Sequence, residues 1–132
     1  MKVLKHIASL AVFQTSVPCT TISFADFDRD GRVDVVLTAL GSPALLLRNT
    51  AGGGNHWIGL RLGIGAQVQI VTASGVQWNQ ATTAVGYASS SEQDVHFGLG
   101  RDTVVKRIEI TWPSGRKQVM ENAAADRYVT VR

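Results

Sequence analysis

The chain has 132 residues, of which 45% are hydrophobic and 17% are charged, and its formal net charge at pH 7 is +3. This length suits one compact domain, or one domain plus a fragment, with a real hydrophobic core. The lysines and arginines are scattered singly, without a basic run or a basic-aromatic motif, so the composition argues against nucleic acid binding.

Thirteen glycines and the lack of apolar heptads favour a turn-rich β-protein over a helix bundle. The single cysteine, Cys19, excludes an internal disulfide framework and a cysteine-rich zinc site. No stretch of the sequence is long and apolar enough to span a bilayer, so we expect no transmembrane segment.

Residues 1–21 form an N-terminal segment with two interpretations. Lys2 and Lys5 precede an apolar run at residues 7–13, which has about the length of a signal-peptide hydrophobic region. No small-x-small cleavage site follows, and Pro18 stands where a lipobox needs a small residue. The alternative is an amphipathic helical turn or a remnant of an upstream strand.

Residues 22–50 centre on an acidic loop. After an apolar lead-in at residues 22–25, four of the ten acidic residues of the chain fall within residues 26–34. Carboxylates at alternating positions repel each other in any fold, so this pattern indicates a bound cation. The hard ion that accepts six to eight oxygens at flexible geometry is calcium.

The spacing predicts a role for each residue of the loop. The predicted ligands are the side-chain oxygens of Asp26, Asp28, Asp30 and Asp34 and the backbone carbonyl of Arg32. Gly31 would supply the positive φ that folds the loop round the ion. The alternative is an acidic surface turn that holds no ion.

The loop is not an EF-hand, because that motif needs a bidentate Glu at its twelfth position and a helix on each side. The twelfth position here is Leu37, and residues 33–38 are a β-branched run typical of a strand. The sequence F-A-D-F-D-R-D-G-R-V-D-V-V-L at residues 24–37 resembles an FG-GAP or VCBS-type repeat, the calcium-loop unit of propeller blades. We find one such repeat in this sequence, whereas a propeller needs several.

A turn at residues 41–43 and a returning strand at residues 44–49 would complete a hairpin, or part of a propeller blade. The glycine-rich residues 51–54 follow as a predicted linker. These glycines could also cradle a phosphate, but no GK[ST] follows them and the next element is a strand, so we favour the linker.

From residue 55 onward, longer stretches alternate between apolar and polar side chains. Alternation and turn chemistry predict strands at residues 56–62, 66–72, 76–82, 94–100, 104–112, 116–120 and 128–131. Residues 86–91 read as a polar loop, and Trp112-Pro113-Ser114-Gly115 has the composition of a tight turn. This part should therefore contain at least six strands and almost no helix.

Four motifs in residues 55–132 resemble the ASPIC/UnbV domain. They are N-H-W-I-G-L-R-L from residue 55, G-I-G-A-Q-V from residue 63, D-V-H-F-G-L-G from residue 94 and I-E-I-T-W-P-S-G-R from residue 108. One departure lies at residues 92–94, where the family's usual acidic or Asn residue and Pro are replaced. The resemblance implies an extracellular or cell-envelope module that follows FG-GAP/VCBS repeats, and it supplies no catalytic residues.

The sequence also contains residue types that an enzyme or another kind of site would need. The serines at 89–91 with Asp94 and His96 offer the residue types of a triad, but they lie in no strand-turn-helix elbow and lack the order that a triad needs. His56 and His96 could bind zinc, although three histidines without a nearby cysteine favour structural roles. A sugar-stacking platform could use exposed aromatic residues, for which the candidates are Trp78, Trp112 and Tyr87, with core or hairpin packing as the alternative.

We therefore predict an all-β protein in which a calcium-loop hairpin precedes an antiparallel β-sandwich-like domain at residues 55–132. The predicted function is that of a non-enzymatic, calcium-binding interaction or adhesion module, secreted or in the cell envelope, with a protein or glycan ligand at the cell surface. The alternatives are a carbohydrate-binding module with exposed aromatic residues and an accessory domain of a larger envelope enzyme system.

Overall fold

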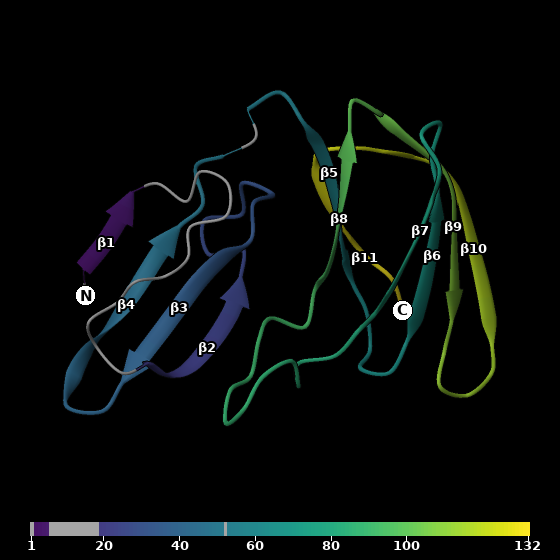
Figure 1. Ribbon diagram of the computed structural model, residues 1–132. Helices are drawn as coiled ribbons and strands as arrows, with labels where there is room; N and C mark the ends of the chain where they lie inside the picture. Colours follow the sequence, from purple (N-terminus) through teal and green to yellow (C-terminus); the bar gives the residue numbers. More distant parts are fainter. Residues whose placement is uncertain (1, 6–18, 52) are drawn as a thin grey trace. The chain divides into compact units, whose positions relative to one another are not determined.

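The computed structural model describes residues 2–5, 19–51 and 53–132. Every helix or strand among these residues is a β-strand (Figure 1), so the predicted all-β fold is confirmed. The described part of the chain contains no helix with the length and apolar character that crossing a membrane requires. Most of the predicted N-terminal segment, residues 6–18, lies outside the described residues, and the signal-peptide interpretation stays a prediction.

The chain divides into two compact units, and unit 1 consists of Met1–Gly53 and Thr83–Glu92. Its strands form one sheet in the order β1-β4-β3-β2. These strands are β1 (Lys2–Lys5), β2 (Cys19–Ala25), β3 (Asp34–Ala39) and β4 (Ser42–Arg48). The β2–β3 and β3–β4 pairs are antiparallel, and β1 pairs with β4 in parallel.

The hairpin of β3 and β4 turns earlier than the sequence predicted. The turn lies at Leu40 and Gly41, where Gly41 has a φ of 72°. Ser42 and Pro43, which the sequence placed in the turn, instead begin β4. Proline is tolerated at the start of a strand, because its missing amide removes no bond from the centre of the ladder.

Residues 83–92 belong to unit 1 and lie against β2, the last strand of its sheet. The Phe24 amide donates to Ser91 Oγ at 3.1 Å, and the Glu92 amide donates to the Phe24 carbonyl at 2.8 Å. These bonds satisfy backbone groups that an edge strand would otherwise expose. The sequence predicted a linker at residues 51–54 but did not foresee this return of the chain.

Unit 2 consists of Gly54–Thr82 and Gln93–Arg132 and contains two sheets, in the orders β10-β9-β6-β7 and β11-β5-β8. Its strands are β5 (His56–Arg61), β6 (Gln67–Val71), β7 (Val76–Gln80), β8 (Val95–Gly100), β9 (Val104–Thr111), β10 (Lys117–Ala124) and β11 (Arg127–Thr130). The strands pair antiparallel except for β11 and β5, which are parallel. The expectation of at least six strands in this region is confirmed.

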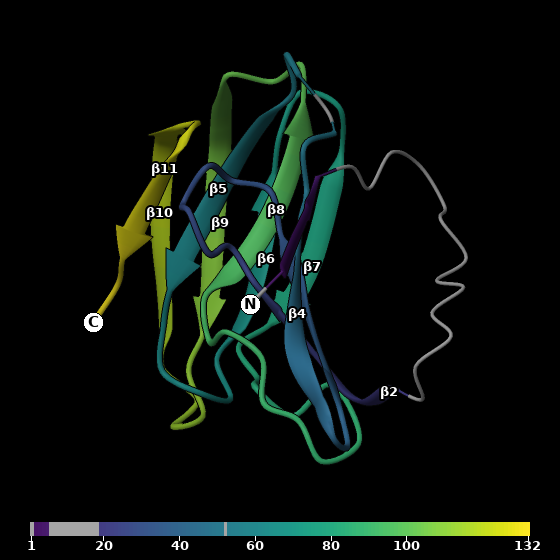
Figure 2. The same cartoon turned by 90° about the vertical axis from the view of Figure 1, so that its left-hand side faces the viewer.

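The core of unit 2 lies between its two sheets (Figures 1 and 2), because alternate side chains of each sheet point into one cluster. The largest fully buried members come from β5, β6 and β9, and they are Ile58, Leu60, Val68, Ile70, Val105, Ile108 and Ile110. Burying each such side chain stabilises the fold by about 1.5–3 kcal/mol. Residues at the intervening positions of β6 and β9 face away from this core.

Gly59 lets strand β11 join the smaller sheet of unit 2. It lies opposite Tyr128 on β11 and His96 on β8, and the Tyr128 ring covers it so closely that a Cβ would come within 2.4 Å of ring atoms. The same ring packs edge-on against Trp57, at 5.0 Å between centroids, and against His96, at 5.5 Å. The aromatic group therefore fixes the position of β11 over a residue without a side chain.

We expect Gly59→Ala to destabilise unit 2 by about 1–3 kcal/mol, because the added methyl group must displace the Tyr128 ring. The matched control is Gly98→Ala on the neighbouring strand β8, where an added Cβ meets no atom within 4 Å. Urea denaturation of both variants measures the difference. Equal stabilities for the two variants would contradict the close packing of Tyr128 on Gly59.

Asp102 holds the turn between β6 and β7. Its carboxylate accepts hydrogen bonds from the Thr72 hydroxyl and, at 2.9 Å, from the Ser74 amide. These bonds lower the pKa of Asp102 below its ordinary value, with the Thr72 hydroxyl as the largest cause. A carboxyl with a lowered folded-state pKa adds stability above its unfolded pKa and loses it as the pH falls through the folded value.

Wild-type protein should therefore exceed the Asp102→Asn variant in free energy of unfolding at pH 7, and this difference should shrink as the pH falls to about 2. Urea denaturation of both proteins across this range measures the difference. A difference that stays constant from neutral to acid pH would show that the charge of Asp102 does not hold the turn.

Candidate metal centre

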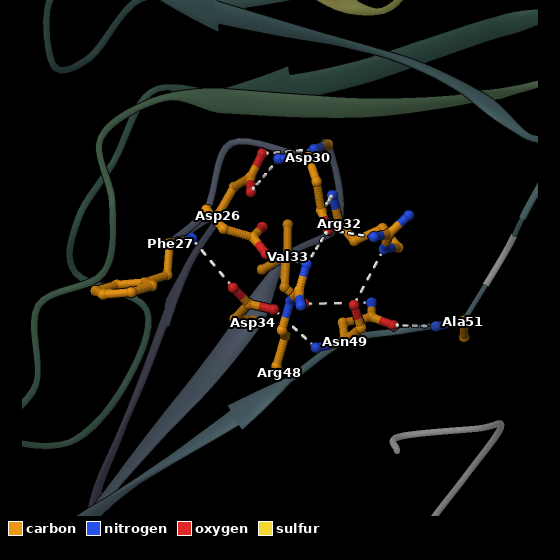
Figure 3. A network of polar contacts seen from close by, with 11 residues as sticks. Asp26, Phe27, Asp30, Arg32, Val33, Asp34, Arg48, Asn49 and Ala51 are labelled. Atoms are coloured by element: carbon orange, nitrogen blue, oxygen red, sulfur yellow. Dashed lines mark hydrogen bonds and ion pairs between the residues drawn. The ribbon is translucent and has the colours of Figure 1, made fainter. Parts of the chain in front are cut away.

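The acidic loop joins β2 to β3 and forms a network of polar contacts (Figure 3), and two of its carboxylates are buried. Asp26 follows the last residue of β2 and is 3% exposed, and Asp34 is the first residue of β3 and is 2% exposed. A buried carboxylate is costly unless hydrogen bonds or a cation compensate for its lost hydration. The contacts of these two side chains therefore decide what the loop can do.

Backbone amides hold both buried carboxylates. Asp26 accepts from the Asp30 amide at 3.0 Å and from the Gly31 amide at 2.7 Å, one bond to each oxygen. Asp34 accepts from the Phe27 amide at 3.1 Å and from the Asn49 amide at 2.7 Å, again one to each oxygen. A carboxylate oxygen has a second lone pair, so each can also face an ion.

The backbone of the loop is wound tightly enough to bring these amides inward. Gly31 has a φ of 85°, in the left-handed region that the sequence predicted for it, and Arg29 has a φ of 58°. Glycine adopts this conformation without strain, whereas most other residues do not. The turn at Gly31 thereby directs its own amide at Asp26.

Three of the predicted ligands converge. Asp26, Asp28 and Asp34 each offer one carboxylate oxygen, and these oxygens lie within 4.8 Å of one another. Oxygens bound to one calcium ion at about 2.3–2.6 Å cannot be more than about 5 Å apart. The three aspartates are therefore close enough to bind one metal ion, and theirs is the one such group of His, Cys, Asp or Glu side chains among the described residues.

Asp30 and Arg32 are arranged differently from the sequence prediction. The Asp30 carboxylate accepts from the Arg32 amide at 2.9 Å and forms an ion pair with the Arg32 guanidinium. Arg48 Nη2 lies 3.5 Å from the same carboxylate. Asp30 thus lies outside the convergent group of three, and its predicted role as a ligand, like that of the Arg32 carbonyl, stays a prediction.

Arg48, at the end of β4, also forms an ion pair with Asp28. One guanidinium group therefore contacts two of the four loop aspartates. Its Nε atom is buried and has no hydrogen-bond partner among the described residues. An ion bound through Asp28 would compete with Arg48 for that carboxylate.

Burial raises the pKa of Asp34 above its ordinary value. The amides of Asn49 and Phe27 lower it in part, and the nearby charges of Asp28 and Asp30 raise it again. Desolvation and like charge thus disfavour the ionised form of Asp34. A bound divalent cation would offset both effects.

Glu92 is a residue of this centre that the sequence did not reveal. Its Oε2 accepts from the Asp26 amide at 2.8 Å, although the two residues are 66 positions apart in the chain. The bond fixes the backbone from which the Asp26 carboxylate projects. Nothing in the spacing of the loop could have identified this partner, because it arrives with the return of residues 83–92 to unit 1.

Three of the residues considered for a catalytic triad, Asp94, His96 and Ser91, have other contacts. Asp94 is 8% exposed and accepts from Arg61 Nε at 3.0 Å and from Arg61 Nη2 at 2.7 Å. His96 packs edge-on against Tyr128, and Ser91 Oγ accepts from the Phe24 amide. These contacts give all three side chains structural roles.

The residues considered for zinc binding and for sugar stacking also differ in whether they have a structural role. His56 Nδ1 lies 2.7 Å from an Asp126 carboxylate oxygen, which ties the start of β5 to the residues before β11. Trp112 packs against the core of unit 2, and its indole donates to Gln118 at 3.3 Å. Tyr87 lies in unit 1 and Trp78 lies on β7 in unit 2, where it is 68% exposed.

Residues 59–132 match the family described as ASPIC and UnbV, and the chain belongs to this family. It is 33% identical to cartilage acidic protein 1 of Mus musculus over 117 residues, covering 80% of this chain and 18% of the relative. It is 34% identical to cartilage acidic protein 1 of Homo sapiens over 111 residues, covering 76% of this chain and 16% of the relative. The chain therefore spans less than a fifth of the length of these relatives.

We expect Glu92→Ala to expose the Asp26 amide to solvent exchange and to lower the free energy of unfolding of unit 1 by about 1 kcal/mol, because it removes one hydrogen-bond acceptor. Glu92→Gln keeps a side-chain oxygen and should retain most of the protection. Hydrogen exchange of the Asp26 amide, followed by NMR, measures the effect.

The control for this experiment is Glu121→Ala, which removes an exposed glutamate on β10 in unit 2. It should leave the exchange of the Asp26 amide unchanged. The role assigned to Glu92 is wrong if the Asp26 amide is protected in Glu92→Ala, Glu92→Gln and Glu121→Ala as well as it is in the wild-type protein.

Proposed function

We propose that this chain is a calcium-binding, non-enzymatic interaction or adhesion module that acts outside the cell or in the cell envelope. The observation that carries the proposal is the convergence of Asp26, Asp28 and Asp34 within 4.8 Å. Two of these carboxylates are buried and already oriented by backbone amides, so little order must be created when the ion binds.

The donor set favours calcium over other common ions. The converging ligands are all carboxylate oxygens, whereas zinc sites in proteins usually contain nitrogen or sulfur. Magnesium requires tight octahedral geometry and gives up its water reluctantly, while calcium accepts irregular shells of six to eight oxygens. Asp30, the Arg32 carbonyl and water are the proposed sources of the remaining ligands.

The setting of the loop supports its assignment to an FG-GAP/VCBS-type repeat. Such a repeat needs strands rather than helices on both sides, and the antiparallel strands β2 and β3 flank the loop. We propose that residues 22–50 form one repeat of this type and that it precedes the ASPIC/UnbV domain. A longer protein could supply further repeats, since the relatives are several times longer than this chain.

The surroundings of the loop predict weak affinity. Calcium must displace Arg48 from Asp28 and Arg32 from Asp30 before either carboxylate can turn fully to the ion. We therefore expect a dissociation constant of about 0.1–1 mM, the range of extracellular calcium modules. Such a site fills outside cells, where calcium is abundant.

The location and partner of the module are inferred in part from its relatives. Their name, cartilage acidic protein 1, refers to a tissue, which supports a place outside the cell. The partner we propose is a protein or glycan at the cell surface. The structural roles of Asp94, His96 and Ser91 support a module without catalytic residues of its own.

Isothermal titration with calcium should give heat with a dissociation constant of about 0.1–1 mM, and magnesium should give much less. Asp28→Ala should remove most of the calcium response, because it removes a converging ligand. Asp30→Ala should reduce the response less, because the Asp30 carboxylate is engaged by two arginines.

Asp102→Asn is the matched control, since it removes a carboxylate from unit 2 and should leave the titration unchanged. Calcium should also raise the melting temperature of wild-type protein as its concentration passes the dissociation constant. No heat at millimolar calcium, or equal heats from wild type and Asp28→Ala, would mean that the loop is an acidic turn without an ion.

A further inference from the structure

The outer face of the larger sheet in unit 2 has an unusual composition. Because Val68 and Ile70 of β6 point into the core, their neighbours Gln67 and Gln69 point away from it. Gln69 pairs with Trp78 on one side and with Glu109 on the other, and Glu109 pairs with Val119. A row of four side chains thus crosses all four strands, with Trp78 at one end.

The next row of the same face runs from Lys117 through Thr111 and Gln67 to Gln80. A third row consists of Glu121, Arg107, Val71 and Val76. We call the surface formed by these three rows the Trp78 face. It holds an exposed indole ring beside three glutamine side chains. An amide group both donates and accepts hydrogen bonds, as a sugar hydroxyl does.

Trp78 is costly to leave in water. Its side chain is 68% exposed, and its neighbour in the adjacent row, Val76, is 53% exposed. A tryptophan ring stabilises a fold mainly through burial, so an exposed one contributes little to unit 2. The ring is available to stack on a ligand.

The strand that carries Trp78 is held in place from its other face. Gln77 donates to the Gly98 carbonyl at 2.8 Å, and Asn79 donates to the His96 carbonyl at 3.4 Å. Both carbonyls belong to β8 of the second sheet, so side chains of β7 bridge the two sheets at this edge. Trp78 therefore projects from a backbone that is fixed before any ligand binds.

The balance of charges on the face favours an uncharged ligand over a polyanion. The Trp78 face carries two basic and two acidic residues, which are Arg107, Lys117, Glu109 and Glu121. Arg107 lies 3.1 Å and Lys117 3.6 Å from oxygens of Glu109, and Glu121 pairs across the strands with Arg107. The face thus has no formal net charge, although the whole chain has +3. An uncharged partner complements it, and a polyanion would have to compete with Glu109.

We propose that the Trp78 face binds a neutral oligosaccharide, with the Trp78 ring stacking on a sugar ring and Gln67, Gln69 and Gln80 bonding to hydroxyl groups. This site lies wholly in unit 2 and does not require the calcium loop. A neutral oligosaccharide is thus the ligand class that we assign to the interaction module proposed above. Because the two sites lie in different units, a negative result at one site does not contradict the other.

The test is titration of the full chain with cellohexaose, mannohexaose, xylohexaose and chitohexaose. Binding is monitored through the NMR signal of each tryptophan indole. At least one of these sugars should shift the Trp78 indole and amides of β6 and β7. Trp78→Ala should weaken binding by about tenfold or more, and Gln69→Ala by severalfold. Trp78→Tyr keeps an aromatic ring and should retain part of the affinity.

The matched control is Tyr87→Ala, which removes another exposed aromatic ring, in unit 1, and should bind as the wild type does. Trp78 is exposed, so Trp78→Ala should keep the wild-type melting temperature. Equal affinity in Trp78→Ala, or no shift with any of the four sugars, would overturn the proposal. Two other results would also overturn it. One is tighter binding of a heparin hexasaccharide that Lys117→Ala abolishes, and the other is a dimer that Trp78→Ala dissociates.

Discussion

The acidic loop depends on four backbone amides that donate to two buried carboxylates. Without the bonds from Asp30 and Gly31, Asp26 would be a desolvated charge at the end of β2, and Asp34 would be in the same position without Phe27 and Asn49. These bonds fold the loop inward and bring the carboxylates together, which increases their repulsion. The loop therefore concentrates negative charge that arginine side chains or a metal ion must balance.

The geometry of the loop depends on residues of unit 1 that lie outside the loop itself. Its buried apolar cluster in the described residues consists of Val35, Leu37 and Leu47, with Leu45 packed against it. Such a small core cannot by itself fix the geometry of a ligand set. Polar contacts from distant residues contribute instead, because Arg48 reaches the loop from β4 and Glu92 reaches it from the returning segment. Unit 2 has a much larger core, and its exposed features, such as Trp78, are available for contacts that stability does not require.

Much of the fold could be predicted from the sequence, because alternation along a strand is a local property. The strands β5 to β9 lie within a few residues of their predicted positions, and Gly31 has the predicted positive φ. Pairing over long distances could not be predicted in the same way. The parallel pairing of β11 with β5 depends on the fit of Tyr128 over Gly59, and no local pattern encodes that contact.

In the candidate site, too, local spacing could be predicted from the sequence and contacts between side chains could not. The spacing of Asp26, Asp28 and Asp34 predicted the residues that converge, but it could not predict that Asp30 would bond to Arg32 and Arg48. Side chains of either sign compete for partners in the folded chain, and the outcome depends on which of them the strands bring close. Among the tryptophans, exposure distinguishes Trp78 from the core-packed Trp112, and composition alone ranked them equally.

We propose that the loop holds a calcium ion through Asp26, Asp28 and Asp34. A crystal structure of the chain grown with calcium chloride, with the ion identified by its anomalous scattering, tests this most directly. We expect an ion about 2.3–2.6 Å from one oxygen of each of the three carboxylates, with the amides of Asp30 and Gly31 still bonded to Asp26. A loop in which Arg48 remains paired with Asp28, and in which no anomalous peak lies among the three aspartates, would contradict it.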